Sequence, residues 1–398
     1  MQPRLNRIGQ GWQYGTLEFV LPDGSTWQIG NSPPVVSVRV NDPAMRWRML
    51  KHPRLGFGEA YMDGQWDQVD GNLPEILEVC VRNLDRLSTS GLGGRWWQAS
   101  RAYFRDFHTR RRALENVHHH YDLDYALYRS FLDQDHHYSC AYFKNQSDTL
   151  ETAQQAKCAH IATKLDLPPQ AKVLDIGCGW GSLALFIAEH YGAHCTGITL
   201  SKEQLKVARS RARKRGLDAR VDFRLMDYRD IEGEFDAIVS VGMFEHVGKP
   251  GYNIFFQCLR DLLAPDGVAL IHTIGRYSAS GGADPWLRKY IFPGGYVPSA
   301  SEILKSVEKN GLISCDLEFW RLHYALTLDH WNERFQAARA DVTKRMDDRF
   351  CRMWEFYLQA CSACFRYGDL AVFQLQMTRT LNRLPLTRDY IYQSSAAM

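Results

Sequence analysis

The run Val173–Gly181 constrains the fold of this 398-residue chain more than any other feature of its sequence. An apolar strand pattern leads into three glycines, Gly177, Gly179 and Gly181, and then into the start of a helix. Glycine has no Cβ and adopts positive φ at little cost, so the backbone of such a turn can lie directly against a ligand. The run therefore predicts a strand–turn–helix unit that binds a nucleoside.

The spacing of these glycines narrows the choice of ligand. G-x-G-x-G is shorter than the G-x-G-x-x-G fingerprint of dinucleotide-binding turns, which hold a pyrophosphate at a helix N-terminus. A smaller, cationic nucleoside such as S-adenosylmethionine fits better, with Asp175 supplying negative charge beside the turn. Glycine turns also occur as plain structural turns, so the motif alone leaves both interpretations open.

The second half of the chain predicts a doubly wound α/β fold. Strand patterns alternate there with helical ones, which is typical of βαβ units and a mostly parallel sheet. Ligands of such sheets bind beyond the carboxyl ends of the strands. We therefore expect one crevice bounded by Gly177, Thr199, Asp227 and Glu245. The predicted strands are 172–177, 194–199, 220–227, 235–242, 267–275, 312–320 and 369–379, and the predicted helices include 201–215 and 251–263.

The sequence divides into three predicted parts. Residues 1–90 predict a small α+β domain, with a hairpin, a further strand and a helix over 73–87. The flexible run Ser88–Gly94 marks its end. Residues 91–115 form a linker, and residues 116–398 form the domain that contains the predicted sheet.

The linker interleaves arginines with aromatic residues. Such a stretch can lie on an anionic membrane, and it is equally typical of a solvated helix whose aromatic side chains pack inward. The first thirty residues lack the apolar stretch of a signal peptide, and no run of eighteen apolar residues occurs. We therefore expect a cytoplasmic protein that associates peripherally with the inner membrane face.

The cysteines and histidines do not predict a metal site. The ten cysteines lack the spacing of a disulfide framework, so we expect them to be reduced. The pair Cys361 and Cys364 forms the single C-x-x-C motif, without a second pair to complete a zinc site. Adjacent histidines at 118–120 point in different directions and cannot chelate one ion together.

Several segments of the chain resemble the cyclopropane fatty acid synthases, which are S-adenosylmethionine-dependent enzymes acting on unsaturated phospholipid acyl chains. Each segment alone is a weak signal, but their order and spacing along most of the chain are specific. The segments are Gly58–Gly64, Tyr138–Phe143, Val173–Gly181, Gly197–Ser201, Phe244–Gly248, Ile271–Ile274, Ile291–Tyr296 and His323–Leu328.

The resemblance implies a class I S-adenosylmethionine methyltransferase-like sheet with a small N-terminal α+β domain. Residues 1–90 would dock on lipid, and residues 116–398 would be catalytic. The implied reaction transfers a methylene from S-adenosylmethionine across the double bond of a phospholipid acyl chain and forms a cyclopropane ring. The partner would be an anionic membrane surface, with no nucleic acid, and a homodimer is compatible with this arrangement.

The resemblance also assigns cofactor-binding residues. The second predicted strand ends at Thr199 without the carboxylate that often takes the ribose hydroxyls, so the ribose must be held otherwise. An ordinary strand-end threonine and a solvated glutamine are the plain alternatives for Thr199 and Gln204. The implied set is Tyr138, Ser139, Asp175, Gly177, Gly179, Gly181, Thr199, Leu200, Gln204, Asp227 and Tyr228.

A second implied set concerns ring closure. Methyl transfer to an alkene leaves a carbocation, and a base must then remove a proton from the added methyl. In the family that this chain resembles, the base is a bound bicarbonate. The residues that match its binding site are Cys140, Glu245, His272, Ile274 and Tyr324. Two anions repel unless one is protonated, so the protonation state of Glu245 stays open. Taken singly, Cys140 and His272 are more typical of buried core residues.

The chain departs from the family pattern at Leu123–Ala126, where a Gly-Asn-containing stretch is expected. This departure leaves the product open. A methyl-branched or methylene-bearing chain would arise if the same cation lost a different proton. Methylation of a soluble amine is a second class of activity, and a lipid-binding module without catalysis is a third.

Overall fold

A computed structural model of the chain describes residues 11–69, 72–87, 125–278, 281–282 and 284–393. The chain divides into two compact units. The first takes its described residues from Met1–Arg101, Ala283–Ile291 and Leu328–Asp369, and the second from Ala102–Gly282, Phe292–Thr327 and Leu370–Met398. The first unit therefore includes late segments of the chain, and the predicted linker at 91–115 lies outside the described residues.

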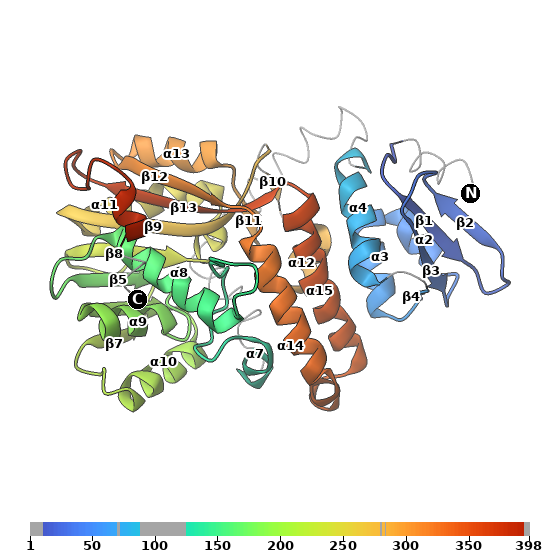
Figure 1. Cartoon of the computed structure of the whole chain (residues 1–398), viewed down its shortest axis with the longest axis horizontal. Helices are drawn as coiled ribbons and strands as arrows, with labels where there is room; N and C mark the ends of the chain where they lie inside the picture. The colour runs from blue at the N-terminus through green and yellow to red at the C-terminus, as the bar shows by residue number, and fades with distance from the viewer. Residues whose placement is uncertain (1–10, 70–71, 88–124, 279–280, 283, 394–398) are drawn as a thin grey trace. The chain divides into compact units, whose positions relative to one another are not determined.

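The first unit contains a four-stranded sheet in the order β2-β1-β3-β4 (Figure 1). The hairpin predicted near the N-terminus is present as an antiparallel β1–β2 pair. Aromatic rings of Phe57, Trp66 and Phe356 pack together in its core. The elements are β1 (Thr16–Val20), β2 (Thr26–Ile29), β3 (Val35–Val40), α2 (Met45–Lys51), α3 (Pro53–Met62), β4 (Trp66–Gln68), α4 (Leu73–Leu87), α12 (Pro285–Tyr290) and α15 (Asp348–Tyr367).

The second unit contains a seven-stranded sheet in the order β12-β13-β9-β8-β5-β6-β7. Strand β13 runs antiparallel to both its neighbours, and the pairs from β9 to β7 are parallel. This is the predicted doubly wound α/β sheet. The strands are β5 (Lys172–Ile176), β6 (His194–Thr199), β7 (Val221–Leu225), β8 (Phe235–Val241), β9 (Leu263–Arg276), β12 (Ile313–Trp320) and β13 (Leu370–Thr378), with a small β10 (Gly281–Gly282) and β11 (Tyr296–Val297) pair apart from them.

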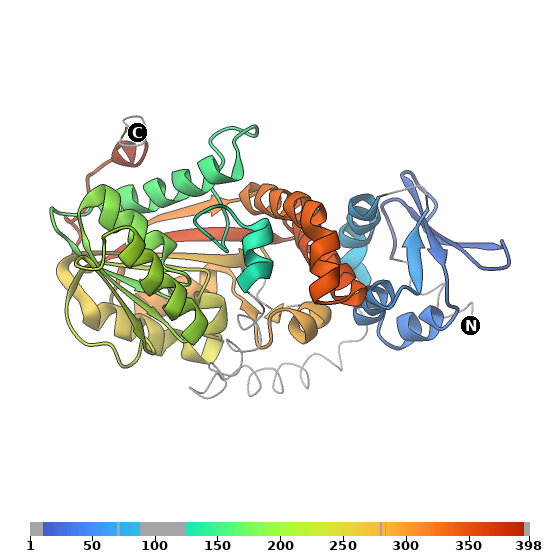
Figure 2. The ribbon, with the colours of Figure 1, turned by 90° about the horizontal axis from the view of Figure 1, so that it is seen from below.

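Helices cover both faces of this sheet (Figure 2). One buried cluster joins the strands to α8, α9 and α10, and another joins them to α11 and α13. The helices of this unit are α7 (Tyr125–Phe131), α8 (Leu150–Leu165), α9 (Ser182–Tyr191), α10 (Lys202–Lys214), η1 (Phe244–His246), η2 (Lys249–Gly251), α11 (Tyr252–Leu262), α13 (Ala300–Lys309) and α16 (Asp389–Gln393), and α14 (His323–Arg345) begins here.

Strand alternation decides which side chains face α8. Val173 of β5 and Leu270 of β9 belong to the cluster on the α8 side. Side chains two residues apart on a strand point to the same face. Asp175 and His272, each two residues further along, therefore face α8 as well.

The strand bounds follow the sequence pattern closely, with one clear difference. Strand β9 begins at Leu263, before the predicted start at 267. Leu263 pairs with Phe235 of β8, and the register shifts between this pair and the next. Pairing with β8 therefore extends β9 through residues whose sequence is typical of a turn. Within the described ranges, no helix combines the length and apolar character needed to cross a membrane.

The glycine turn joins β5 to α9 with positive φ at all three glycines. A Cβ at Gly181 would lie 2.4 Å from the Phe223 ring, which packs against the turn. A Cβ at Gly179 would meet no atom within 4 Å. Packing therefore requires glycine at Gly181, whereas Gly179 leaves open space beside the backbone.

We predict that Gly181→Ala destabilises the protein by about 2–4 kcal/mol, since a left-handed backbone and a clash with Phe223 add together. Gly179→Ala, with the backbone cost alone, should lose about 1 kcal/mol. Urea unfolding of both variants provides the measurement. Equal losses would contradict the packing role of Gly181.

Candidate active site

A cavity opens at the carboxyl ends of β5, β6, β7 and β8. The structure brings most of the predicted cofactor residues around it, and Gly181 is the exception because it packs on Phe223. Glu245 does not line this cavity, although its neighbours Met243 and His246 do. The predicted residues that line it are Tyr138, Ser139, Asp175, Gly177, Gly179, Thr199, Leu200, Gln204, Asp227 and Tyr228.

Thr199 and Gln204 are buried and bonded to each other. The Thr199 hydroxyl donates to Gln204 Oε1 at 2.7 Å. The Ser201 hydroxyl caps α10 by accepting from the Gln204 backbone N–H at 3.2 Å. Gln204 is therefore no solvated surface residue, because the helix cap and Thr199 hold it at the cavity wall.

Asp227, Tyr228 and Arg229, which follow β7, form another part of the cavity wall. Arg229 donates to both carboxylate oxygens of Asp227, at 2.7 and 2.6 Å. Its guanidinium also lies 5.3 Å from the centroid of the Tyr228 ring. Burial raises the pKa of Tyr228 to about 12, so its hydroxyl is protonated at neutral pH. Arg229 was not predicted, and it neutralises the Asp227 carboxylate.

The base of the cavity contains an unsatisfied carboxyl group. Asp175 is buried, and its Oδ2 has no hydrogen-bond partner among the described residues. Burial raises the pKa of Asp175 to about 7, against the opposing charges of Lys157 and His137. A positively charged group bound beside it would restore the carboxylate.

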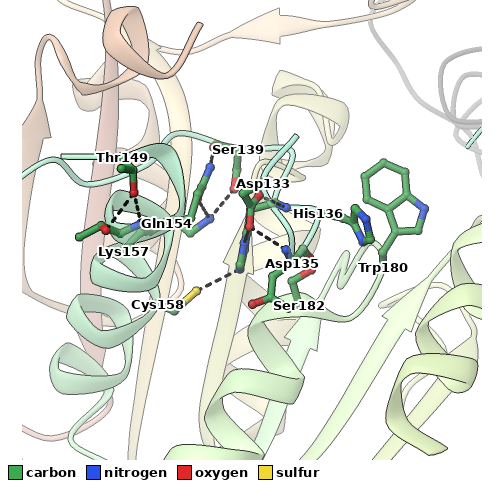
Figure 3. Close-up of polar contacts among 12 residues, drawn as sticks. Asp133, Asp135, His136, Ser139, Thr149, Gln154, Lys157, Cys158, Trp180 and Ser182 are labelled. Carbon is green, nitrogen blue, oxygen red and sulfur yellow. Dashed lines mark hydrogen bonds and ion pairs between the residues drawn. The ribbon is translucent and has the colours of Figure 1, made fainter. Parts of the chain in front are cut away.

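Lys157, which acts electrostatically on Asp175, belongs to a polar network with Ser139 and Gln154 (Figure 3). Lys157 of α8 donates to Ser139 Oγ at 3.0 Å and to Gln154 Oε1 at 2.6 Å. Gln154 Nε2 in turn donates to the Ser139 carbonyl oxygen at 3.0 Å. Lys157 lines the cavity and was not predicted. The signal available in the sequence was a lysine on the buried face of a helix.

A second part of the network joins Asp133, His137 and Cys158. Asp133 Oδ2 lies 2.8 Å from His137 Nδ1, and Cys158 Sγ lies 3.2 Å from His137 Nε2. Burial disfavours the imidazolium, but Cys158 and Asp133 together raise the pKa of His137 to about 9. His137 lines the cavity and carries positive charge at neutral pH.

Glu245 and Ile274 of the second predicted set contact each other directly. Glu245 follows β8 in η1, and its Oε1 accepts from the Ile274 backbone N–H at 2.6 Å. Its Oε2 is buried without a partner in the described part of the chain. Burial raises the pKa of Glu245 to about 7. The Ile274 amide, predicted to hold an anion, is therefore occupied by this carboxyl group.

His272 lies on β9 beside this pair. Gln374 Nε2 lies 3.1 Å from His272 Nδ1, and with the amide so oriented Nδ1 accepts and the ring proton lies on Nε2. Burial lowers the pKa of His272 well below its usual value, with Lys157 and Lys164 acting in the same direction. His272 is therefore a neutral imidazole that can donate one hydrogen bond.

Cys140 and Tyr324 are linked through the start of α14. The Ala141 backbone N–H donates to Thr327 Oγ1 at 3.0 Å, and Tyr324 lies one helical turn before Thr327. The ring of Trp320 lies edge-on to His272, with centroids 5.0 Å apart. Burial raises the pKa of the Cys140 thiol, so this cysteine is no thiolate nucleophile.

Two family comparisons cover most of the chain. Residues 108–375 match the family described as mycolic acid cyclopropane synthetase. Residues 13–91 match a family described as a domain of unknown function.

Curated relatives align over nearly the whole chain. The cyclopropane-fatty-acyl-phospholipid synthase of Escherichia coli K12 is 38% identical over 382 residues, 91% of this chain and 96% of that protein. A tuberculostearic acid methyltransferase of Mycobacterium tuberculosis is 36% identical over 380 residues, 91% of this chain and 88% of that protein. Among solved structures, the mycolic acid cyclopropane synthase CmaA1 in complex with SAH and CTAB is 33% identical with a TM-score of 0.63, and the match covers 66% of this chain and 97% of that one.

We predict that binding of S-adenosylmethionine releases protons near pH 7. The cationic ligand favours the charged form of Asp175, whose pKa is about 7 in the free protein, so affinity should increase between about pH 6 and pH 8. Calorimetry in buffers of different ionisation enthalpy measures the protons released. Asp175→Asn should abolish the part of the proton release that comes from this carboxyl group. An unchanged proton release in that variant would contradict the assignment of the released proton to Asp175.

Proposed function

Because the chain belongs to the mycolic acid cyclopropane synthetase family, we propose that it transfers a methylene from S-adenosylmethionine across the double bond of unsaturated phospholipid acyl chains. The observation that carries the proposal is the pairing of a nucleoside cavity with a separate buried set of acid and histidine side chains. The cavity takes the cofactor. The second set handles the proton that ring closure releases.

The cavity residues fit S-adenosylmethionine. Thr199 and Gln204 offer polar groups to the ribose, and the unpartnered Asp175 oxygen suits the positive charge of the methionine half. The bound cofactor would supply an electrophilic methyl group. Alignment of that group with an alkene in a dry site can lower the barrier by about 7–11 kcal/mol.

The second set fits a small oxyanion such as bicarbonate. Glu245 Oε2 lacks a partner, His272 presents a neutral N–H, and the Cys140 backbone N–H makes no hydrogen bond among the described residues. A pKa of about 7 allows the Glu245 carboxyl to be protonated, which relieves its repulsion of an anion. Ile274 would contribute by holding Glu245 in place.

Ring closure then has a defined course. A C–H bond of the added methyl breaks, its electrons form the third carbon–carbon bond, and the proton passes to the oxyanion held by His272 and Glu245. Similarity to a tuberculostearic acid methyltransferase keeps a methyl-branched product as the second candidate. In that case the same cation would react further without closing a ring, and acyl-chain analysis distinguishes the two products.

Helix α2 supports docking of the first unit on an anionic membrane. Its Trp47 is 69% exposed and is flanked by Arg46 and Arg48. Arg48 pairs with Asp63, whereas Arg46 and Lys51 add positive charge to the same helix. Tryptophan beside basic residues is typical of surfaces that lie at the membrane interface.

We predict that Glu245→Gln and Tyr324→Phe reduce turnover far more than cofactor affinity. Glutamine can still accept from the Ile274 amide but cannot exchange a proton with an oxyanion, so kcat should fall about 100-fold or more. Purified enzyme with unsaturated phospholipid gives kcat and KM.

Lipid analysis of a host expressing the chain, with and without Glu245→Gln, tests the product in cells. Cyclopropane acyl chains should appear with the unaltered chain and be nearly absent with the variant. Equal activity of either variant and the unaltered enzyme on purified lipid would refute the role of this set.

We predict that Trp47→Ala weakens binding to vesicles containing phosphatidylglycerol by about fivefold, because roughly 1 kcal/mol of apolar burial is lost. Vesicle sedimentation measures the partitioning. Leu386→Ala, which truncates a fully exposed apolar side chain of the second unit, is the control and should bind as before. Unchanged binding by Trp47→Ala would remove α2 from the docking surface.

A further inference from the structure

Helix α8 contains two buried lysines, and the groups that contact their ammonium charges differ. Lys164 Nζ lies 2.9 Å from Asp316 and 2.8 Å from Glu318, so two carboxylates compensate its charge. Lys157, two turns earlier and equally buried, contacts the neutral oxygens of Ser139 and Gln154. Among the described residues it forms no ion pair with a carboxylate. A buried ammonium without a counter-ion is costly, and a bound anion would relieve that cost.

The direction of the hydrogen bonds shows what this end of the cavity offers a ligand. An ammonium group can only donate, so Ser139 Oγ accepts from Lys157 and keeps its own hydrogen for another partner. Gln154 accepts from Lys157 through Oε1 and donates through Nε2 to the Ser139 carbonyl. With Ser139 and Gln154 each taking one N–H of Lys157, its third N–H has no partner among the described residues. Ser139 and Lys157 both line the cavity. Two donors, one of them charged, therefore face the ligand.

The position of these donors selects one part of the ligand, given the cofactor of the proposed function. S-adenosylmethionine has a single anionic group, the carboxylate of its methionine half. Thr199, Gln204 and Tyr228 line the part of the cavity assigned to the nucleoside. Lys157 is close enough to Asp175 of β5 to lower its pKa, and Ser139 is hydrogen-bonded to Lys157. We propose that Lys157 and Ser139 bind the methionine carboxylate, with Lys157 of α8 as its counter-ion.

The test compares ligands with and without that carboxylate. S-adenosylhomocysteine contains it, and 5′-methylthioadenosine lacks the amino acid end. Lys157→Met should weaken binding of S-adenosylhomocysteine about 10- to 100-fold, the value of a charge-assisted hydrogen bond, and leave binding of methylthioadenosine within about twofold. Calorimetry provides both dissociation constants, and neither depends on turnover.

Lys164→Met is the matched control, because it removes an equally buried lysine from the same helix but away from the cavity. It should lower stability without changing the ratio of the two affinities. An unchanged ratio in Lys157→Met would overturn the inference. If Lys157→Met fails to fold, the unaltered protein provides the test through the affinities of S-adenosylmethionine and its decarboxylated form. Equal affinities would overturn the inference, and at least tenfold weaker binding of the decarboxylated form would support it. Failure of the unaltered protein to bind S-adenosylhomocysteine would instead contradict the proposed cofactor.

Discussion

The second unit depends on a layer of polar groups buried between α8 and the sheet. Removing an ionised group from water costs several kcal/mol unless a partner of opposite charge and hydrogen bonds compensate it. Lys164 meets this condition within the protein, through Asp316 and Glu318 of β12. This ion-pair cluster fixes the distal half of α8 on the sheet. Lys157 has no such counter-ion in the part of the chain that the structure describes, and it is Lys157 that borders the cavity.

The same layer links the cavity to the acid and histidine set. Asp175 and His272 lie on different strands but both face α8. Each lies two residues after a strand residue that packs on the α8 side, and alternate side chains of a strand point to the same face. Lys157 lowers the pKa of both groups. The charge of Lys157 therefore acts on one group of each set, although no residue of the second set lines the cavity.

Local patterns in the sequence predicted the positions of the strands in the second half of the chain and the glycine turn, because periodicity and backbone freedom are properties of neighbouring residues. The resemblance supplied residues that the fold gathers around one cavity, from Tyr138 to Tyr228. Lys157 and Arg229 were missed because their significance depends on contacts with distant segments or on burial that no short pattern encodes. The assignment of Leu328–Asp369 to the first unit was missed for the same reason, since helical periodicity does not reveal which core a helix joins.

Two buried carboxyl groups, Asp175 and Glu245, have pKa values near 7, but their surroundings differ. Asp175 lies within the influence of Lys157 and His137, and a cationic ligand in its cavity would lower its pKa further. Among the described residues, the donors to Glu245 are uncharged, chiefly the Ile274 amide, so an oxyanion beside it would raise its pKa. Occupation of both sites would thus separate two similar acids into a carboxylate that stabilises the cofactor and a protonated acid that donates to the anion. A pair of carboxyl groups driven apart in this way can serve both electrostatic binding and proton transfer at one pH.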